Sequence, residues 1–145
     1  MSVKRTGSLD QALNKLLVRK DLHVKVGVLT NSKYPDGTSV PTVAYKNEYG
    51  WGDIPPRPFF RDTIKNEKKN WGVLARECAK AGYGVEKILG LVGLAMQNDI
   101  QSAIMAWQIP PNAPYTVAMK GFNKPLIHTS LLHDSIKFEL VEGRL

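Results

Sequence analysis

The residues of this chain that could do acid–base, nucleophilic or metal chemistry are three histidines, one cysteine and thirteen carboxylates. His128 and His133 lie five positions apart, whereas two metal ligands on one helix face need a spacing of three or four. His23 falls on the polar side of an alternating segment. Cys78 falls on the apolar face of a helical pattern, where an inert buried thiol is expected. We therefore expect no metal site and no nucleophilic cysteine.

The carboxylates and glycines give no catalytic pattern either. No two of the following acids have a spacing that places both carboxylates on one face: Asp10, Asp21, Asp53, Glu77, Asp99 and Asp134. The segment 82–84, "GYG", lacks the lysine and hydroxyl of a phosphate-binding loop, and Gly90 and Gly93 lie inside a helical pattern where they favour close packing. We expect no cofactor, and an enzyme is the least favoured of the function classes considered.

Length and composition predict a globular protein with one domain over residues 1–145. The chain has 43% hydrophobic and 23% charged residues, which is typical of a folded domain. A single cysteine excludes an intramolecular disulfide, which fits assembly in a reducing cytosol. The longest apolar run, residues 88–96, is too short to span a bilayer, so we expect no membrane anchor and no signal peptide.

Basic residues are concentrated at the start of the chain. The net charge is +7, and residues 1–33 hold seven lysines and arginines against two aspartates. Clustered cations attract phosphates without sequence preference, so this segment is a candidate for contact with DNA or with an acidic partner protein. The residues in question are Lys4, Arg5, Lys15, Arg19 and Lys20. The alternative is a solvated surface that keeps the protein soluble.

Hydrophobic periodicity predicts the elements that must position any functional residue. Leucines at helical spacing predict a short helix over 8–20, and strict alternation predicts a strand over 22–30. A loop is expected over 31–41, around Pro35-Asp36-Gly37, and a short helix over 42–50 with Thr42 as its N-cap and Val43, Ala44 and Tyr45 near one face. Residues 54–60, "IPPRPFF", form a stiff entry to a long helix, because proline suits a first helical turn.

The second half completes an α+β fold. The long helix is expected to run to the glycines at 81–84, and a second long helix follows over 85–107. Leu91 and Leu94 widen the apolar face of this second helix, so we expect it to be covered on two sides, either within the domain or by a neighbouring subunit. A proline-rich loop over 109–125 leads to a helical turn and a strand over 135–142, which should pair antiparallel with 22–30. The predicted fold is a small antiparallel β-sheet packed against two long α-helices, with long proline-rich loops. Trp71 and Trp107 are in phase with the core, so Trp51 is the tryptophan that a loop leaves free for a partner.

Two stretches resemble a known family. Residues 43–64, "VAYKNEYGWGDIPPRPFFRDTI", and 100–141, "IQSAIMAWQIPPNAPYTVAMKGFNKPLIHTSLLHDSIKFELV", are similar to the tail-completion or neck proteins of long-tailed double-stranded DNA bacteriophages, often described as minor tail or virion morphogenesis proteins. The family commonly has an acid, a threonine and a glycine where this chain has His128, Thr129 and Ser130. Because serine tolerates a positive φ poorly, we expect a different loop conformation there.

The resemblance implies a non-enzymatic virion protein that forms a ring, expected to be hexameric, where the tail joins the head. It would be assembled in the bacterial cytoplasm and would contact the connector or stopper, the tail terminator and the tail tube, with non-specific contact to packaged DNA. On this reading Phe60 points into the core. The implied subunit or ring interface consists of Trp51, Ile54, Pro55, Pro56, Arg57, Pro58 and Phe59 with Pro110, Pro111, Asn112, Tyr115, Lys120 and Phe122 from the second loop.

Two alternatives stay open. A tail-terminator ring, which caps the finished tail tube, has a similar small α+β design. From a different class, a small basic DNA-binding protein fits the pI of about 9.6 and the basic first segment.

Overall fold

The protein is described from a computed structural model over residues 21–108, 110–121, 123, 126 and 130–143. The helix expected over 8–20, the basic residues Lys4, Arg5, Lys15, Arg19 and Lys20, and Phe122 lie outside the described residues. The elements are β1 (Leu22–Val28), α2 (Val40–Tyr49), α3 (Phe59–Lys80), α4 (Val85–Ala106), α5 (Pro114–Lys120), α6 (Leu131–Asp134) and β2 (Ile136–Glu142). This is the expected α+β class.

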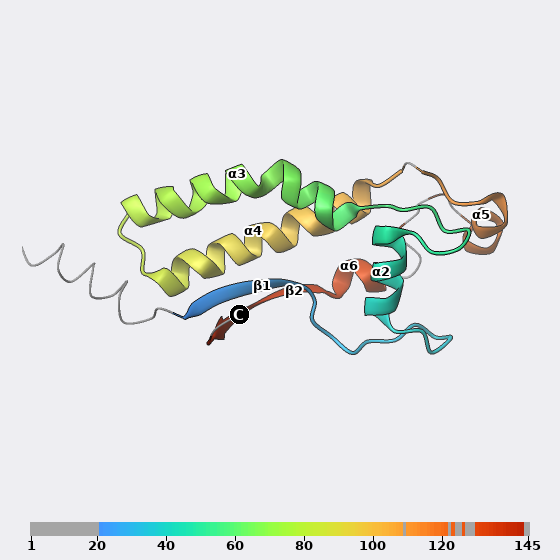
Figure 1. Ribbon diagram of the computed structural model, residues 1–145, viewed down its shortest axis with the longest axis horizontal. Helices are drawn as coiled ribbons and strands as arrows, with labels where there is room; N and C mark the ends of the chain where they lie inside the picture. The colour runs from blue at the N-terminus through green and yellow to red at the C-terminus, as the bar shows by residue number, and fades with distance from the viewer. Residues whose placement is uncertain (1–20, 109, 122, 124–125, 127–129, 144–145) are drawn as a thin grey trace, which may run out of the picture.

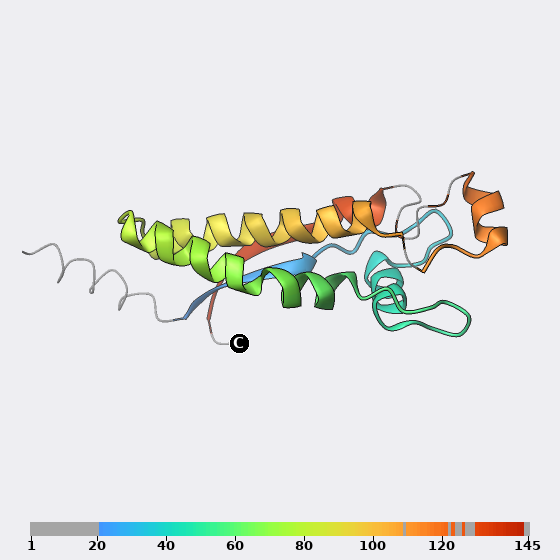
Figure 2. The same ribbon diagram turned by 90° about the horizontal axis from the view of Figure 1, so that it is seen from above.

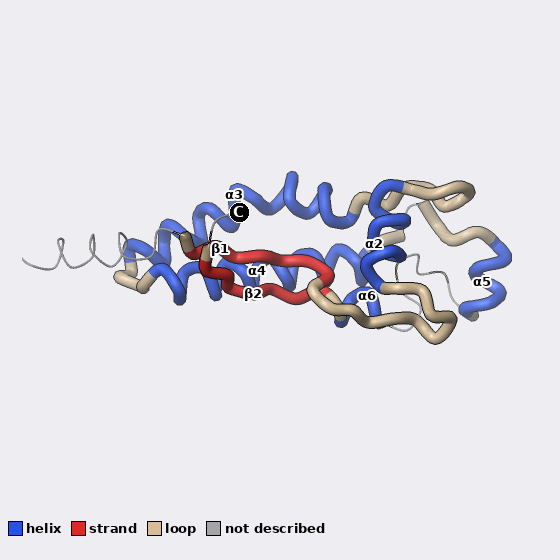
Figure 3. The backbone as a smooth tube through the Cα atoms, turned by 60° about the horizontal axis from the view of Figure 1, so that its bottom comes forward, coloured by secondary structure: helices blue, strands red, loops and turns tan. Residues whose placement is uncertain are grey.

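The two strands form the predicted antiparallel pair. Val24 lies opposite Leu140 and Val26 lies opposite Phe138, so the alternating apolar residues of both strands share one face of the sheet. That face packs on α4, which also contacts α3 along its length (Figure 1). Seen from the sheet side, both strands run along α4 (Figure 3). The second long helix is therefore the central element of the fold.

The α3–α4 hairpin is joined by a hydrogen bond as well as by apolar contacts. Trp71 Nε1 donates to Asp99 Oδ2 at 2.6 Å, and Trp71, Cys78 and Val92 are buried. The predicted burial of Cys78 is confirmed. A second, larger core lies where the hairpin meets α2 and α6, and its buried members are Val40, Ala44, Phe59, Ile100, Ile104, Leu126, Leu132 and Ile136. The molecule is elongated, with the hairpin turn at one end and α2 and α5 at the other (Figure 2).

Gly93 is the point of closest approach between α4 and the sheet. A Cβ at Gly93 would lie 2.5 Å from Cδ2 of Phe138 and 2.7 Å from Cγ2 of Val24. Gly93→Ala is therefore expected to lower the free energy of unfolding by about 2 to 3 kcal/mol, because a filled core must shift to accept a methyl group. The interpretation of Gly93 as a close-packing glycine is confirmed.

Gly90 offers the matched control on the same helix. No described atom lies within 4 Å of a Cβ at Gly90, so Gly90→Ala is expected to raise the free energy of unfolding by about 0.5 to 1 kcal/mol through helix propensity. Urea unfolding followed by circular dichroism measures both variants. Two substitutions with the same sign and size would contradict the close contact at Gly93.

Helix α2 begins earlier than predicted. Its N-cap is Ser39, not Thr42, and Ser39 Oγ accepts a hydrogen bond from the Thr42 backbone N–H at 3.3 Å. Pro41 in the first turn is compatible with this start, because first-turn N–H groups have no partner within the helix. The loop predicted over 109–125 was also wrong in part, since it contains α5, which begins at a proline and ends at Gly121 in the left-handed conformation.

Ser130 holds a strained backbone. Its φ is 59°, and it is the non-glycine residue with positive φ in the described part of the chain. A left-handed conformation costs a residue with a Cβ about 1 kcal/mol or more. The Ser130 side chain makes no capping hydrogen bond to α6, so local bonding of that side chain does not offset the strain. The serine therefore adopts here the conformation for which it was expected to be poorly suited.

Candidate docking site

The two proline-rich loops meet at the end of the molecule that carries α2 and α5 (Figures 1 and 2). The first loop leaves α2 through Gly50, whose φ is 78° and where a Cβ would lie 3.0 Å from the carbonyl oxygen of Ile54. Trp51 and Ile54 then exchange two backbone hydrogen bonds, at 3.0 and 2.9 Å. The chain thus makes a tight turn whose shape depends on glycine and on paired backbone groups.

Arg57 fastens the first loop to the second. Its Nε donates to the carbonyl oxygen of Pro110 at 3.1 Å, its Nη2 donates to that of Pro111 at 3.0 Å, and its Nη1 donates to Asn47 Oδ1 at 3.2 Å. Only 5% of the residue is exposed. Arg57 was predicted as part of a subunit interface, but its guanidinium is buried among acceptors of its own chain, so in the folded protomer it shapes the loops and is not itself an exposed contact.

A second cation lies close to this arginine. Burial lowers the pKa of Arg57 below its ordinary value, yet a guanidinium remains charged at neutral pH. Burial, and then the positive charge of Arg57, lower the pKa of Lys120 at the end of α5. The half-buried Lys120 therefore belongs to the region that Arg57 fastens, and not to an open cationic surface.

Glu48 of α2 caps α3 from outside the helix. Its Oε2 accepts from the Phe60 N–H at 2.9 Å and its Oε1 accepts from the Arg61 N–H at 3.0 Å, two donors that have no partner within a first helical turn. Arg61 Nε also donates to Oε1 at 2.9 Å. The carboxylate is buried, and its charge lies where the helix dipole favours an anion. The entry angle of α3 is thereby fixed against α2.

Exposed aromatic side chains lie on α2 and on the first loop, the segments that Glu48 and Arg57 hold in place. Tyr45 and Tyr49 stack with ring centroids 4.9 Å apart, and their exposed fractions are 58% and 53%; Trp51 is 62% exposed. Arg61 lies over the Tyr49 ring at 4.6 Å. We refer to Tyr45, Tyr49, Trp51 and Ile54 as the aromatic patch. Partly exposed aromatics on a rigid support are the side chains that most often anchor protein–protein contacts.

A shallow groove of about 290 Å³ adjoins the aromatic patch, between α2 and the first turns of α3. Tyr45, Tyr49, Phe60 and Ile64 supply most of its apolar walls, and Glu48 and Arg61 supply its charged rim. Apolar walls with a charged rim suit a side chain of another protein more than a small reactive molecule. The groove therefore extends the surface that a partner could contact.

Phe59, expected at an interface, is instead fully buried in the core. Phe60, expected to point into the core, is half-buried: it packs against the core cluster and also lines the groove. Helix α3 begins against α2, and its buried residues there are Phe59 and Thr63. Phe59 is thus excluded as a contact residue in the folded protomer.

The remaining predicted interface residues divide by exposure. Trp51, Ile54, Pro56, Pro111 and Tyr115 are exposed, and Pro55, Pro58 and Pro110 are half-buried. Asn112 is buried, and its backbone N–H donates to Asn123 Oδ1 at 3.1 Å. The sequence reasoning missed Tyr45, Tyr49 and Glu48. A spacing of four, Val40, Ala44, Glu48, marks the buried face of α2, and this spacing could have placed Tyr45 and Tyr49 outside the core.

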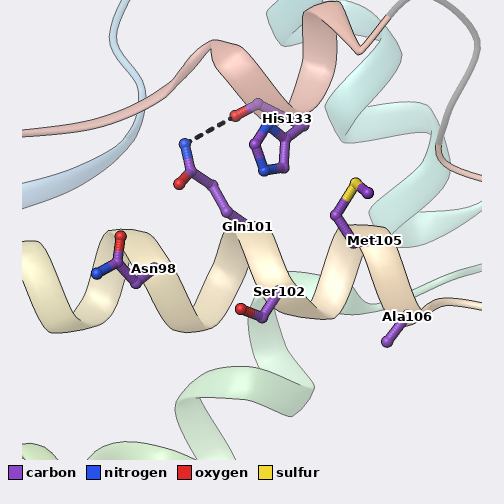
Figure 4. A pocket seen from close by; sticks show the side chains of 6 residues that line it. All are labelled: Asn98, Gln101, Ser102, Met105, Ala106 and His133. Atoms are coloured by element: carbon purple, nitrogen blue, oxygen red, sulfur yellow. Dashed lines mark hydrogen bonds between the residues drawn. The ribbon is translucent and has the colours of Figure 1, made fainter.

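A second open groove lies between α4 and α6, with a volume of about 450 Å³ (Figure 4). Gln101 Nε2 donates to the carbonyl oxygens of His133 and Ile136, at 3.1 and 3.2 Å, so its polar head ties α4 to α6 and β2. His133 Nδ1 lies 2.7 Å from Asp134 Oδ1. The other lining side chains, Asn98, Ser102, Met105 and Ala106, do not titrate. The groove is lined by one histidine, His133, and one hydroxyl, Ser102, and no hydrogen bond joins the two side chains.

Two further features, a metal-ligand cluster and a membrane-spanning helix, are absent from the described residues. Within the described residues, no group of three or more histidine, cysteine, aspartate or glutamate side chains is placed to hold a metal ion. None of the described helices is long and apolar enough to cross a bilayer. Comparison with known proteins gives no significant match to a family model, a curated protein or a solved structure.

Proposed function

We propose that this protein is a non-enzymatic assembly subunit whose aromatic patch docks onto a neighbouring protein, and that it serves as a tail-completion protein in the neck of a long-tailed bacteriophage. The observation that carries the proposal is that the three exposed aromatic rings of the patch lie on a helix and a turn whose positions are fixed by the hydrogen bonds of Arg57 and Glu48. The two stretches that resemble neck proteins include both loops that Arg57 joins.

This helix and turn support docking because they are already ordered. Proline restricts the loop, the Trp51–Ile54 backbone pair closes the turn, and the Arg57 guanidinium fastens it to the second loop. A surface that is fixed before binding loses little conformational entropy on association. Rigid aromatic side chains then contribute large contact area with few rotatable bonds.

A ring needs two different contact surfaces on each protomer, because a head-to-tail contact joins unlike patches. The second surface proposed is the outer face of α4, where Leu91, Leu94 and Met105 are exposed at helical spacing. In the described part of the protomer Leu91 and Leu94 are 36% and 43% exposed, and in the proposed ring a neighbouring subunit would cover this remaining apolar surface. The aromatic patch of one subunit against α4 of the next would repeat around a ring.

The test replaces the aromatic patch in the phage that encodes the chain. Tyr49→Ser with Trp51→Ala is expected to lower the infectious titre by tenfold or more, because each aromatic hot spot contributes about 2 kcal/mol to a contact. Tyr83→Ser at the α3–α4 turn is the matched control, since it also removes an exposed tyrosine. Urea unfolding must show equal stability for the two variants.

Cryogenic imaging of lysates that lack the gene distinguishes the roles. Filled heads beside unjoined tails would support a neck position. Labelled protein found at the ends of detached tails would instead support the tail-terminator role. Normal infectious particles without the gene would contradict a structural role of either kind.

A further inference from the structure

The solvent-exposed face of α3 carries a row of cations. Six basic residues follow one another at separations of 4, 3, 1, 7 and 4 positions, which places them on one broad helix face, and all six are exposed: Arg61, Lys65, Lys68, Lys69, Arg76 and Lys80. We call them the α3 cation row. At a rise of about 1.5 Å per residue, the row extends over roughly 28 Å.

Carboxylates neutralise only the two ends of the row. Arg61 pairs with Glu48 at 2.9 Å, and Lys80 pairs with Glu77 at 2.9 Å. Among the described residues no carboxylate lies within ion-pair distance of Lys65, Lys68, Lys69 or Arg76. Of the other acids on α3, Glu67 accepts a hydrogen bond from Asn70 Nδ2 at 2.7 Å, and Asp62 lies three positions before Lys65 but makes no ion pair with it. The middle of the row is therefore a stretch of uncompensated positive charge.

Gly72 lies on the same face, between Lys69 and Arg76. A glycine inside a helix costs about 1 kcal/mol relative to alanine. No described atom lies within 4 Å of a Cβ at this position, so packing within the described protomer does not require the glycine. A small residue in the centre of a charged face lets a bulky partner approach the helix backbone closely.

We propose that the α3 cation row binds the phosphate backbone of double-stranded DNA without sequence preference. Phosphate binding needs cations and little else, whereas a protein contact needs an apolar centre. Between Lys65 and Arg76 this face presents a single exposed large apolar side chain, Val73, among four cations. A helix with charges over roughly 28 Å spans most of one turn of the DNA duplex, about 34 Å. An acidic protein surface is the competing partner, and the test separates the two.

This inference goes beyond the proposed function and does not depend on it. The cations expected from the sequence to contact DNA, Lys4, Arg5, Lys15, Arg19 and Lys20, lie outside the described residues, and the α3 cation row is a different set. DNA binding by the full chain is measured without any phage particle, so its failure would leave the docking proposal unaffected.

The experiment measures fluorescence anisotropy of a labelled 20-base-pair duplex with the full chain, between about 50 and 200 mM salt. The row variant carries Lys65→Glu, Lys69→Glu and Arg76→Glu. Two matched variants also reverse three charges each: Lys25→Glu, Lys33→Glu and Lys137→Glu on the other side of the molecule, and Lys4→Glu, Arg5→Glu and Arg19→Glu at the start of the chain. All three change the net charge equally.

The row variant alone is expected to lose tenfold or more in affinity at low salt. Its slope of log affinity against log salt should flatten by about 3, because three phosphate contacts are removed. Equal losses in all three variants, or a loss confined to the variant at the start of the chain, would overturn the proposal. So would competition by polyglutamate that matches competition by unlabelled duplex, because it would indicate an acidic protein as the partner.

Discussion

Arg57→Lys is expected to lower the free energy of unfolding by about 2 to 4 kcal/mol. The arginine donates from three nitrogens to acceptors on α2 and on the second proline-rich loop, and it is almost fully buried. A lysine ammonium carries its donors on one atom and cannot reach these three acceptors together. Each buried acceptor left unsatisfied costs about 1 to 3 kcal/mol.

The matched control is Arg76→Lys, which keeps the charge at an exposed position of α3 and is expected to change stability by less than about 0.5 kcal/mol. Urea unfolding at neutral pH measures both variants. A change for Arg57→Lys no larger than for Arg76→Lys would mean that the guanidinium does not fasten the loops. On the proposed function, the same variant is also expected to reduce phage assembly, although it leaves every ring of the aromatic patch in place.

Glu48→Gln is expected to lower the free energy of unfolding by about 2 to 3 kcal/mol. The glutamate presents two acceptor oxygens to the first-turn N–H groups of Phe60 and Arg61. A glutamine turns one of these oxygens into an NH₂ donor, so one buried N–H faces another donor and stays unsatisfied. The helix start also loses the anion that its dipole favours, which contributes about 0.3 to 1 kcal/mol.

The ion pair with Arg61 adds little to that loss, because the arginine side chain is 53% exposed and solvent screens it. Glu77→Gln is the matched control, since it removes an exposed carboxylate that pairs with Lys80 on the same helix. Its effect is expected to stay below about 0.5 kcal/mol. If thermal or urea unfolding gave equal losses for Glu48→Gln and Glu77→Gln, the capping role of Glu48 would be rejected.

Local patterns were sufficient to predict most of the architecture. Alternation at residues 22–30 and 135–142 predicted both strands and their pairing, because a period of two has one structural solution when one face is buried. Proline before and glycines after predicted the limits of α3. The same signals, a proline in the first turn and a terminal glycine, are present in α5 and would have identified it.

The candidate site was harder to predict because the hydrogen bonds that hold it together join residues that are distant in the sequence. Arg57 contacts carbonyl groups 53 and 54 positions away, and no local pattern distinguishes such a buried arginine from a surface one. The burial of Phe59 has the same origin. Helix α3 contacts both α2 and α4, and its buried residues Phe59, Thr63, Trp71 and Cys78 do not keep one helical phase along the whole helix.

Helix α5 makes few buried contacts with the rest of the protein, and this affects the cooperativity of unfolding. No residue of α5 is buried, and its flanking segment is held by the Arg57 guanidinium and by the Asn112–Asn123 hydrogen bond. Such a segment forms its own local unfolding unit, which opens at a lower free energy than the hairpin and sheet. A ligand that binds only when this segment is folded raises the fraction of molecules in which it is folded. By linkage, anything that favours the folded segment raises the affinity for that ligand by the same factor. Contact with Tyr115 or Met119 would therefore be coupled, through one buried arginine, to the order of the loop that carries Trp51.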